Sequence, residues 1–143
     1  NGRALTAKPV VLLVNSGSAS ASEILSGAIQ DNNRGILVGE KTFGKGLVQS
    51  VRALSDGSGL TVTIAKYLTP NGTDIHKNGI QPDLEIDMPE STLASMTEKD
   101  LGTSKDMQYK FAETALIKVL NSVKNKAAYQ HDRPNINEAL KYK

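Results

Sequence analysis

Pro9-Val-Val-Leu-Leu-Val14, the longest uninterrupted apolar run of the chain, determines the fold class that we expect. A short apolar run bounded by Lys8 and Asn15 predicts a strand buried on both faces, which is typical of a parallel sheet. Ala21 to Gln30 then carries apolar residues at helical spacing, and Gly35-Ile-Leu-Val-Gly39 is a second short apolar strand. This order of strand, helix and strand predicts a right-handed βαβ unit within an α/β domain.

The pattern changes to alternation after residue 46. Leu47, Gln49 and Val51 would share one face of a strand, and Leu60, Val62 and Ile64 alternate with two threonines. The turn-forming sequence Ser55-Asp-Gly-Ser-Gly59 separates the two segments. These two segments therefore predict an antiparallel hairpin. A further short strand is expected at Leu84-Glu-Ile86, after the turn Gly79-Ile-Gln-Pro-Asp83.

The last third of the chain has a different character. Ser91 to Ser104 is polar and predicts a loop, Asp106 to Lys126 predicts an amphipathic helix, and the polar tail after Tyr129 is expected to be loosely held. The predicted apolar face of the helix consists of Met107, Phe111, Ala115, Leu116, Val119 and Leu120. This face can pack on its own domain or mediate a homo-oligomer, and the sequence leaves both possibilities open.

Composition excludes several classes of function. The 143 residues carry a net charge of only +2, and the two Phe and four Tyr offer few rings for base stacking, so we expect no nucleic-acid partner. No apolar run approaches the roughly 20 residues of a membrane-spanning helix. The absence of Cys removes disulfides, thiolate catalysis and thiolate zinc sites, and we expect neither a cofactor nor a metal.

A glycine-rich segment, Gly39-Glu-Lys-Thr-Phe-Gly44-Lys45, matches a phosphate-binding loop up to its lysine. Gly46 stands where that motif requires Ser or Thr for magnesium, and a strand pattern follows instead of a helix. We therefore reject a nucleotide site here.

Four serines, Ser16, Ser18, Ser20 and Ser22, lie between the first strand and the helix. Serines at the start of a helix are usually caps that satisfy free backbone N–H groups. A nucleophile at this place would benefit from the same N–H groups and from the helix dipole, because both stabilise an oxyanion. Position alone leaves both roles open.

A nucleophilic serine requires a base. His76 lies in a turn-rich segment and His131 in the polar tail, so both are expected to be solvated surface residues. A lysine buried in apolar surroundings can replace histidine, because desolvation favours its neutral amine. Lys45 lies between two glycines, Phe43, Leu47 and Val48 can provide apolar surroundings, and Gln49 can orient the amine.

Three groups of residues resemble the carboxyl-terminal processing (tail-specific) serine proteases between about Pro9 and Ile86. They are Val14-Asn-Ser-Gly-Ser-Ala-Ser-Ala-Ser-Glu-Ile24, then Gly39-Glu-Lys-Thr-Phe-Gly-Lys-Gly46 with Gln49, then Leu68-Thr-Pro-Asn-Gly72 with Gly79-Ile-Gln-Pro-Asp83. The resemblance implies a crotonase-like (Clp protease/crotonase) fold of stacked ββα units, here incomplete and followed by a C-terminal helical segment.

The resemblance also implies the site residues. Ser20 would be the nucleophile, Lys45 the general base, Gln49 the residue that orients the lysine, and the backbone N–H of Ala21 half of the oxyanion hole. Ser18 and Ser22 are the rival nucleophiles, with an N-cap and a first-turn serine as their structural roles.

Two acidic residues near these positions are expected to be structural. Asp31 matches an acidic position of the family, but a helix from Ser20 to Asp31 would separate the two by roughly 16 Å, so we expect a role at the helix end. Glu23 is expected to be a first-turn acid that favours the helix dipole instead of a participant in the site.

The same resemblance predicts domain organisation, partners and location. Residues 1–89 would be part of a protease core and residues 90–143 a linker and helix, with an upstream PDZ domain and the first part of the core absent. The partner would be a protein or peptide substrate with an exposed carboxyl terminus, in the periplasm, the cell envelope or the thylakoid lumen. The alternative is a non-catalytic ligand-binding or interaction module on the same fold.

Overall fold

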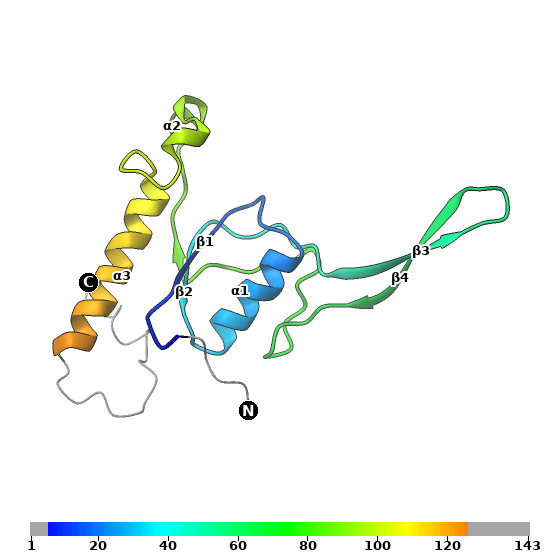
Figure 1. Cartoon of the computed structure of the whole chain (residues 1–143), viewed down its shortest axis with the longest axis horizontal. Helices are drawn as coiled ribbons and strands as arrows, with labels where there is room; N and C mark the ends of the chain where they lie inside the picture. Colours follow the sequence, from blue (N-terminus) through cyan, green and yellow to red (C-terminus); the bar gives the residue numbers. More distant parts are fainter. Residues whose placement is uncertain (1–5, 126–143) are drawn as a thin grey trace.

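The computed structural model describes residues 6–125, which form a mixed α/β arrangement (Figure 1). The elements in chain order are β1 (Val11–Val14), α1 (Ala21–Asp31), β2 (Ile36–Gly39), β3 (Leu47–Ala53), β4 (Gly59–Lys66), β5 (Leu84–Glu85), α2 (Glu90–Ser95), the 3₁₀ helix η1 (Glu98–Asp100) and α3 (Met107–Asn125).

A three-stranded parallel sheet with the order β1-β2-β5 is the centre of the structure. Val11 pairs with Ile36 and Val14 with Gly39, while Val38 pairs with Leu84 of β5. The predicted parallel βαβ arrangement and the short strand near residue 84 are thus confirmed. β2 is the middle strand of this sheet, and all four of its residues are buried.

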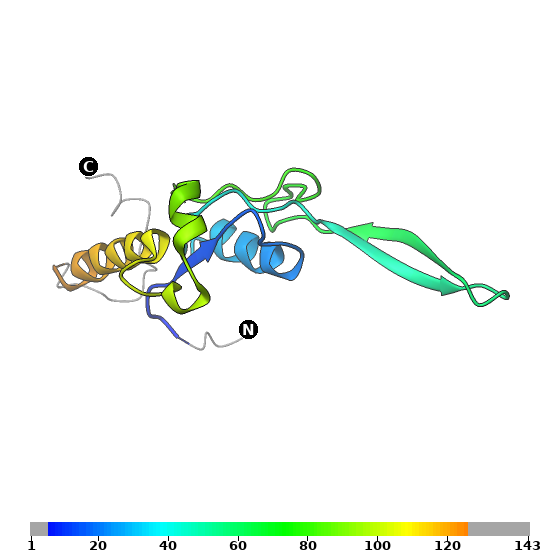
Figure 2. The ribbon, with the colours of Figure 1, turned by 90° about the horizontal axis from the view of Figure 1, so that it is seen from above.

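Successive side chains of β2 point to opposite faces of the sheet, and each face has its own apolar cluster. Ile36 and Val38 pack with Ala112 and Val119 of α3. Leu37, on the other face, packs with residues beside α1, namely Val14, Ile75 and Ile80, with Leu12 and Ile29 at the edge. Figures 1 and 2 show α1 and α3 on opposite sides of the sheet.

The apolar run of β1 is less buried than predicted. Val14 is buried, but Leu13 is 44% exposed and the expectation of burial on both faces is wrong for it. Within the described residues β1 is an edge strand, so an apolar run does not by itself guarantee two covered faces.

The predicted hairpin is confirmed as β3 and β4, which pair antiparallel from Leu47 with Lys66 to Ala53 with Gly59. This two-stranded ribbon projects away from the parallel sheet (Figures 1 and 2). Its pairing register shifts between Val48 and Gln49, as at a β-bulge.

The region predicted as a loop between residues 91 and 104 contains α2 and η1, so that prediction is wrong in part. Both helices are short. The turn at η1 is held by the carboxylate of Asp100, which accepts the backbone N–H and the hydroxyl of Thr97 at 2.9 and 2.8 Å. Side-chain capping of this kind stabilises a short helix that a polar sequence does not reveal.

Helix α3 is confirmed, and its buried face agrees with the prediction in part, at Ala115 and Val119. Ala112, Ala115 and Val119 are buried, whereas Met107, Phe111 and Leu120 are 49%, 44% and 38% exposed. Close packing on the sheet selects the small side chains, because they allow the helix to approach β1 and β2. The predicted tail after Tyr129, with His131, lies outside the described residues.

Among the helices in residues 6–125, none has the length and apolar character needed to cross a membrane.

Candidate active site at the start of helix α1

Ser20 occupies the N-cap position of α1 with a backbone φ of 57° and ψ of −114°. A residue with a side chain rarely adopts positive φ, and such a conformation costs of order 1–3 kcal/mol. It persists only where the surroundings hold it in place. Ala21, directly after it, is the first residue of the helix.

The carboxylate of Glu23 provides that restraint. Its side chain is completely buried, and its Oε2 accepts the backbone N–H of Ser20 at 2.9 Å and that of Lys45 at 2.8 Å. Its Oε1 accepts the hydroxyl of Thr42 and the backbone N–H of Gly44, each at 2.6 Å. One carboxylate therefore joins the start of α1 to the glycine-rich segment that carries Lys45.

The hydrogen bonds also determine the ionisation of Glu23. Burial raises the pKa of a carboxyl, but the bonds from Thr42, Lys45, Gly44 and Ser20 together outweigh it and hold the pKa of Glu23 below its ordinary value of 4.5. The buried carboxylate is thus negatively charged at neutral pH and is matched by four donors.

The expectation that Glu23 serves only the helix dipole is therefore wrong. A sequence signal for its larger role was present, because Ser20 and Glu23 have the three-residue spacing of a capping box. That spacing predicts the bond from Glu23 to Ser20. It cannot predict the bonds to Thr42, Gly44 and Lys45, which are about twenty residues away in the sequence and near only in the fold.

Lys45 lies in the extended segment between β2 and β3, with its side chain exposed among the described residues. Its backbone is tied to Glu23, and the N–H of Phe43 donates to the carbonyl of Ser18 at 3.0 Å. The ring of Phe43 is 66% exposed. The apolar surroundings that we expected from Phe43 are therefore not formed within this part of the chain.

Gln49 lies in β3 directly after the β-bulge, with its side chain exposed. Bulges often occur beside active sites, where they redirect a side chain. Within residues 6–125, hydrogen bonds link Ser20 to Lys45 through their backbones and Glu23, and none joins the side chains of Ser20, Lys45 and Gln49.

The neighbouring serines have local structural roles. The hydroxyl of Ser18 accepts the backbone N–H of Asn15 at 3.0 Å, so it stabilises the turn after β1 and is not the N-cap that we expected. Ser22 is an exposed first-turn residue whose carbonyl accepts the hydroxyl of Ser26 at 2.7 Å. Only Ser20 has the strained backbone at the helix start.

Asp31 and His76 complete the list of candidates from the sequence. Asp31 Oδ2 accepts the backbone N–H of Asn71 at 2.8 Å and so ties the end of α1 to the turn at Thr69–Gly72. His76 is partly buried and its Nδ1 has no hydrogen-bond partner in the described structure, so the expectation of a solvated surface histidine is wrong.

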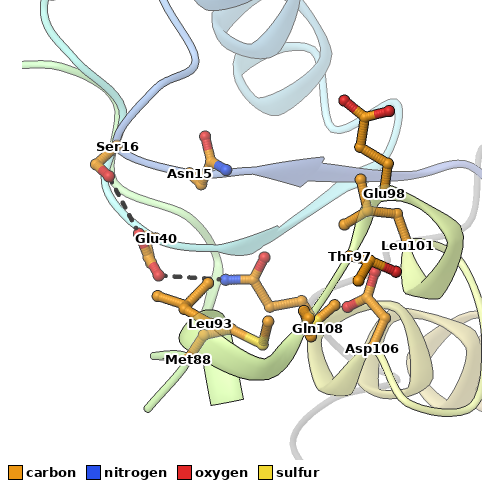
Figure 3. Close-up of a pocket in the computed structure, with 11 residues that line it drawn as sticks. Asn15, Ser16, Glu40, Met88, Leu93, Thr97, Glu98, Leu101, Asp106 and Gln108 are labelled. Atoms are coloured by element: carbon orange, nitrogen blue, oxygen red, sulfur yellow. Dashed lines mark hydrogen bonds between the residues drawn. The ribbon is translucent and has the colours of Figure 1, made fainter. Parts of the chain in front are cut away.

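A pocket of about 350 Å³ opens beside the end of β1, between the sheet and the segment that leads into α3 (Figure 3). On its wall Glu40 accepts hydrogen bonds from Ser16 at 3.3 Å and from Gln108 at 3.4 Å. Gln108 also donates to the carbonyl of Ile86 at 3.1 Å, which attaches α3 to the chain after β5. Met88 and Leu93 supply apolar lining.

The glycine-rich segment has no nucleotide-binding geometry, because β3 and not a helix follows it. Within the described part of the chain, no group of three His, Asp or Glu side chains is arranged to hold a metal ion.

The chain is similar to known proteases over much of its length. The profile of peptidase family S41 matches residues 1–86. A carboxyl-terminal-processing protease of Synechocystis sp. is 56% identical over 112 residues, covering 78% of this chain and 25% of that protein. The chloroplastic C-terminal processing peptidase of Tetradesmus obliquus is 58% identical over 82 residues, covering 57% and 18%.

A solved structure of a photosystem II D1 C-terminal processing protease is 59% identical, with a TM-score of 0.53 over 55% of this chain and 20% of that one. The chain thus spans a quarter or less of the length of these relatives. The family profile nevertheless covers more than half of the chain, so the protein belongs to peptidase family S41.

Proposed function

We propose that the protein is a serine endopeptidase in which Ser20 is the nucleophile and Lys45 the general base, and that it cleaves proteins near their carboxyl termini. The observation that carries this proposal is the shared carboxylate of Glu23, which holds the backbones of Ser20 and Lys45 through the same oxygen. A structural role for Ser20 alone would not require a fixed relation to a lysine 25 positions later.

The proposed reaction begins with the neutral amine of Lys45, which removes the proton of the Ser20 hydroxyl as the oxygen attacks the scissile carbonyl. The backbone N–H of Ala21, at the positive end of α1, stabilises the oxyanion. The protonated Lys45 then returns its proton to the leaving amine, and water activated by the same lysine hydrolyses the acyl-enzyme. Gln49 orients the amine through its side-chain amide.

The carboxyl-terminal substrate class is supported by the names of the relatives, which describe C-terminal processing. We propose the same class here, with the partner a protein whose carboxyl terminus is exposed. The similarity to these proteases also supports a crotonase-like fold for the complete core, with residues 1–89 as part of it and residues 90–143 as a linker and helix.

We further propose location in the periplasm or cell envelope, or in the thylakoid lumen of a photosynthetic organism. Cyanobacterial and chloroplastic relatives support this location.

For a homo-oligomer through α3, Met107 and Phe111 are the proposed contacts, because they lie one turn apart and are both exposed. Sedimentation at several protein concentrations tests it, and Phe111→Ser should shift the distribution toward monomer.

The decisive experiment uses the full-length protein and an unstructured polypeptide with an apolar carboxyl terminus. Ser20→Ala and Lys45→Ala should each abolish cleavage. Ser22→Ala and Lys41→Ala, which remove exposed side chains of the same type nearby, should retain it. Cleavage that survives in Ser20→Ala or Lys45→Ala would refute the dyad.

A fluorophosphonate probe provides an independent measurement. Covalent labelling should map to Ser20 by mass spectrometry and disappear in Ser20→Ala. Polypeptide binding without cleavage or labelling would instead identify a binding module.

A further inference from the structure

The segment that carries Lys45 is packed against a second glycine-containing loop, Ile75 to Ile80. The backbone N–H of Thr42 donates to the carbonyl of Ile80 at 3.1 Å, and the N–H of Lys77 donates to the carbonyl of Gly44 at 2.9 Å. The N–H of Ile80 donates to the hydroxyl of Thr42 at 2.7 Å. The two segments are thus joined by hydrogen bonds before Lys45.

The contact between the two segments leaves no room for side chains. Gly79 has a φ of 62°, and a Cβ on it would overlap the carbonyl oxygen of Thr42. A Cβ on Gly46 would lie 2.7 Å from the backbone nitrogen of His76, and one on Gly44 would lie 3.0 Å from that of Gly79. Glycine at these positions allows direct contact of the two backbones on both sides of Lys45.

The loop is itself anchored in the core. Ile75 is 1% exposed and packs with Val14, Leu37 and Ile80. The N–H groups of Asn78 and Gly79 both donate to the carbonyl of Ile75, at 3.1 and 2.9 Å. The loop is therefore fixed relative to the buried sheet. Its hydrogen bonds fix the segment that carries Lys45 relative to the sheet as well.

We infer that the Ile75–Ile80 loop is a positioning element for Lys45 and that Gly79 is its positioning residue. The backbone around Lys45 is held on one side by Glu23 and on the other by this loop, while the carbonyl of Gly46 accepts the N–H of Tyr67 at 2.7 Å. The inference rests on the proposed function, in which Lys45 is the base. Misplacement of a reacting group by about 1 Å can lower the rate of reaction about 100-fold.

The test compares Gly79→Ala with Gly102→Ala in the full-length protein. Gly102 has a similar φ of 70° but no atom within 4 Å of the added Cβ, so its substitution introduces the same backbone strain without the contact. We expect Gly79→Ala to lower kcat about 100-fold with KM within about twofold of wild type, and Gly102→Ala to change neither beyond about twofold. Unchanged kcat in folded Gly79→Ala would overturn the inference, as would an effect on KM alone.

A second variant covers the case in which Gly79→Ala does not fold. Gly46→Ala introduces a contact with the same loop at a position without positive φ, so the contact acts there without the strain of a left-handed backbone. It should likewise lower kcat and leave KM unchanged. Normal kcat in a folded Gly46→Ala protein would count against the loop.

Amide hydrogen exchange of the wild-type protein tests the geometry without any cleavage assay. The amide of Lys45 donates to Glu23, and the amide of Lys77 donates across the contact to the carbonyl of Gly44. The two amides should show similar protection if the loop and the Lys45 segment open as one unit. Rapid exchange at Lys77 with strong protection at Lys45 would mean that the loop opens independently, and would overturn the inference.

These measurements separate the two proposals. A wild-type protein that fails to cleave refutes the proposed function, and hydrogen exchange then still decides whether the loop holds the Lys45 segment. An active wild type, an inactive Lys45→Ala and a fully active Gly79→Ala refute only the positioning role.

Discussion

The carboxylate oxygen Oε2 of Glu23 accepts the backbone N–H of Lys45 at 2.8 Å, across 22 positions of the sequence. The same oxygen holds the N–H of Ser20, so the helix start and the glycine-rich segment share one buried acceptor. A carboxylate is suited to this role because it is an acceptor on both oxygens and can serve four donors without a proton of its own.

Glu23→Gln should lower the free energy of unfolding by at least about 2 kcal/mol, because the amide NH₂ would face N–H donors and leave buried groups unpaired. Urea unfolding at pH 7 measures the change. Glu40→Gln is the matched control, since Glu40 is only partly buried and its hydrogen bonds are longer, 3.3 and 3.4 Å. An equal loss in both variants would contradict the special role of Glu23.

The stabilisation from Glu23 should depend on pH in one direction. Its pKa in the folded protein lies below the ordinary value of 4.5, so its contribution is complete above pH 4.5 and is lost as the pH falls through the lower folded pKa. The difference in unfolding free energy between wild type and Glu23→Gln should be constant from pH 7 to about 5 and shrink below 4.5. A difference that grows on acidification would contradict the lowered pKa.

Leu37→Ala should destabilise the protein by about 2–5 kcal/mol, because Leu37 is fully buried in the middle strand of the sheet and its loss leaves a cavity. Leu101→Ala, at a site that is 63% exposed, should change stability by no more than about 0.5 kcal/mol. Thermal and urea unfolding check both. Similar losses in the two variants would mean that the core is not centred on β2.

Asp31→Ala should lower stability by about 1 kcal/mol through loss of the hydrogen bond to the backbone N–H of Asn71. Hydrogen exchange at Asn71 should accelerate in the variant, since its amide loses its acceptor. Gln30→Ala, one residue earlier, leaves this bond in place and should not accelerate exchange at Asn71, although it removes bonds to Gln81 and Asp83. Unchanged exchange at Asn71 in Asp31→Ala would refute the tether.

Much of the fold could be predicted from local patterns. The apolar run before residue 15 and the helical spacing after Ala21 predicted β1 and α1, and the alternation between Leu47 and Ile64 predicted the hairpin. Each of these signals depends on residues that are near one another in the chain. The short helices α2 and η1 were missed because they lie in a polar segment that carries no periodic apolar pattern, and η1 is held by the local bonds between Thr97 and Asp100.

Burial was harder to predict than secondary structure. Leu13 and Phe111 belong to apolar patterns, yet both are 44% exposed, while Ala112 and Ala115 are buried against the sheet. A pattern indicates which faces are apolar, but the partner that covers each face is known only when the elements are packed. For the same reason His76 looked like a surface residue from its polar neighbours.

The sequence by itself determined the order of the five strands and of helices α1 and α3, the place of the serines before α1, and the resemblance to a protease family that the family profile bears out. Only the tertiary structure decided that Glu23 joins Ser20 to Lys45, and that the Ile75–Ile80 loop lies against the Lys45 segment. The physical reason is the range of the interactions. Periodicity and capping act over a few residues, whereas a buried carboxylate acquires donors from wherever the folded chain brings unpaired N–H groups together.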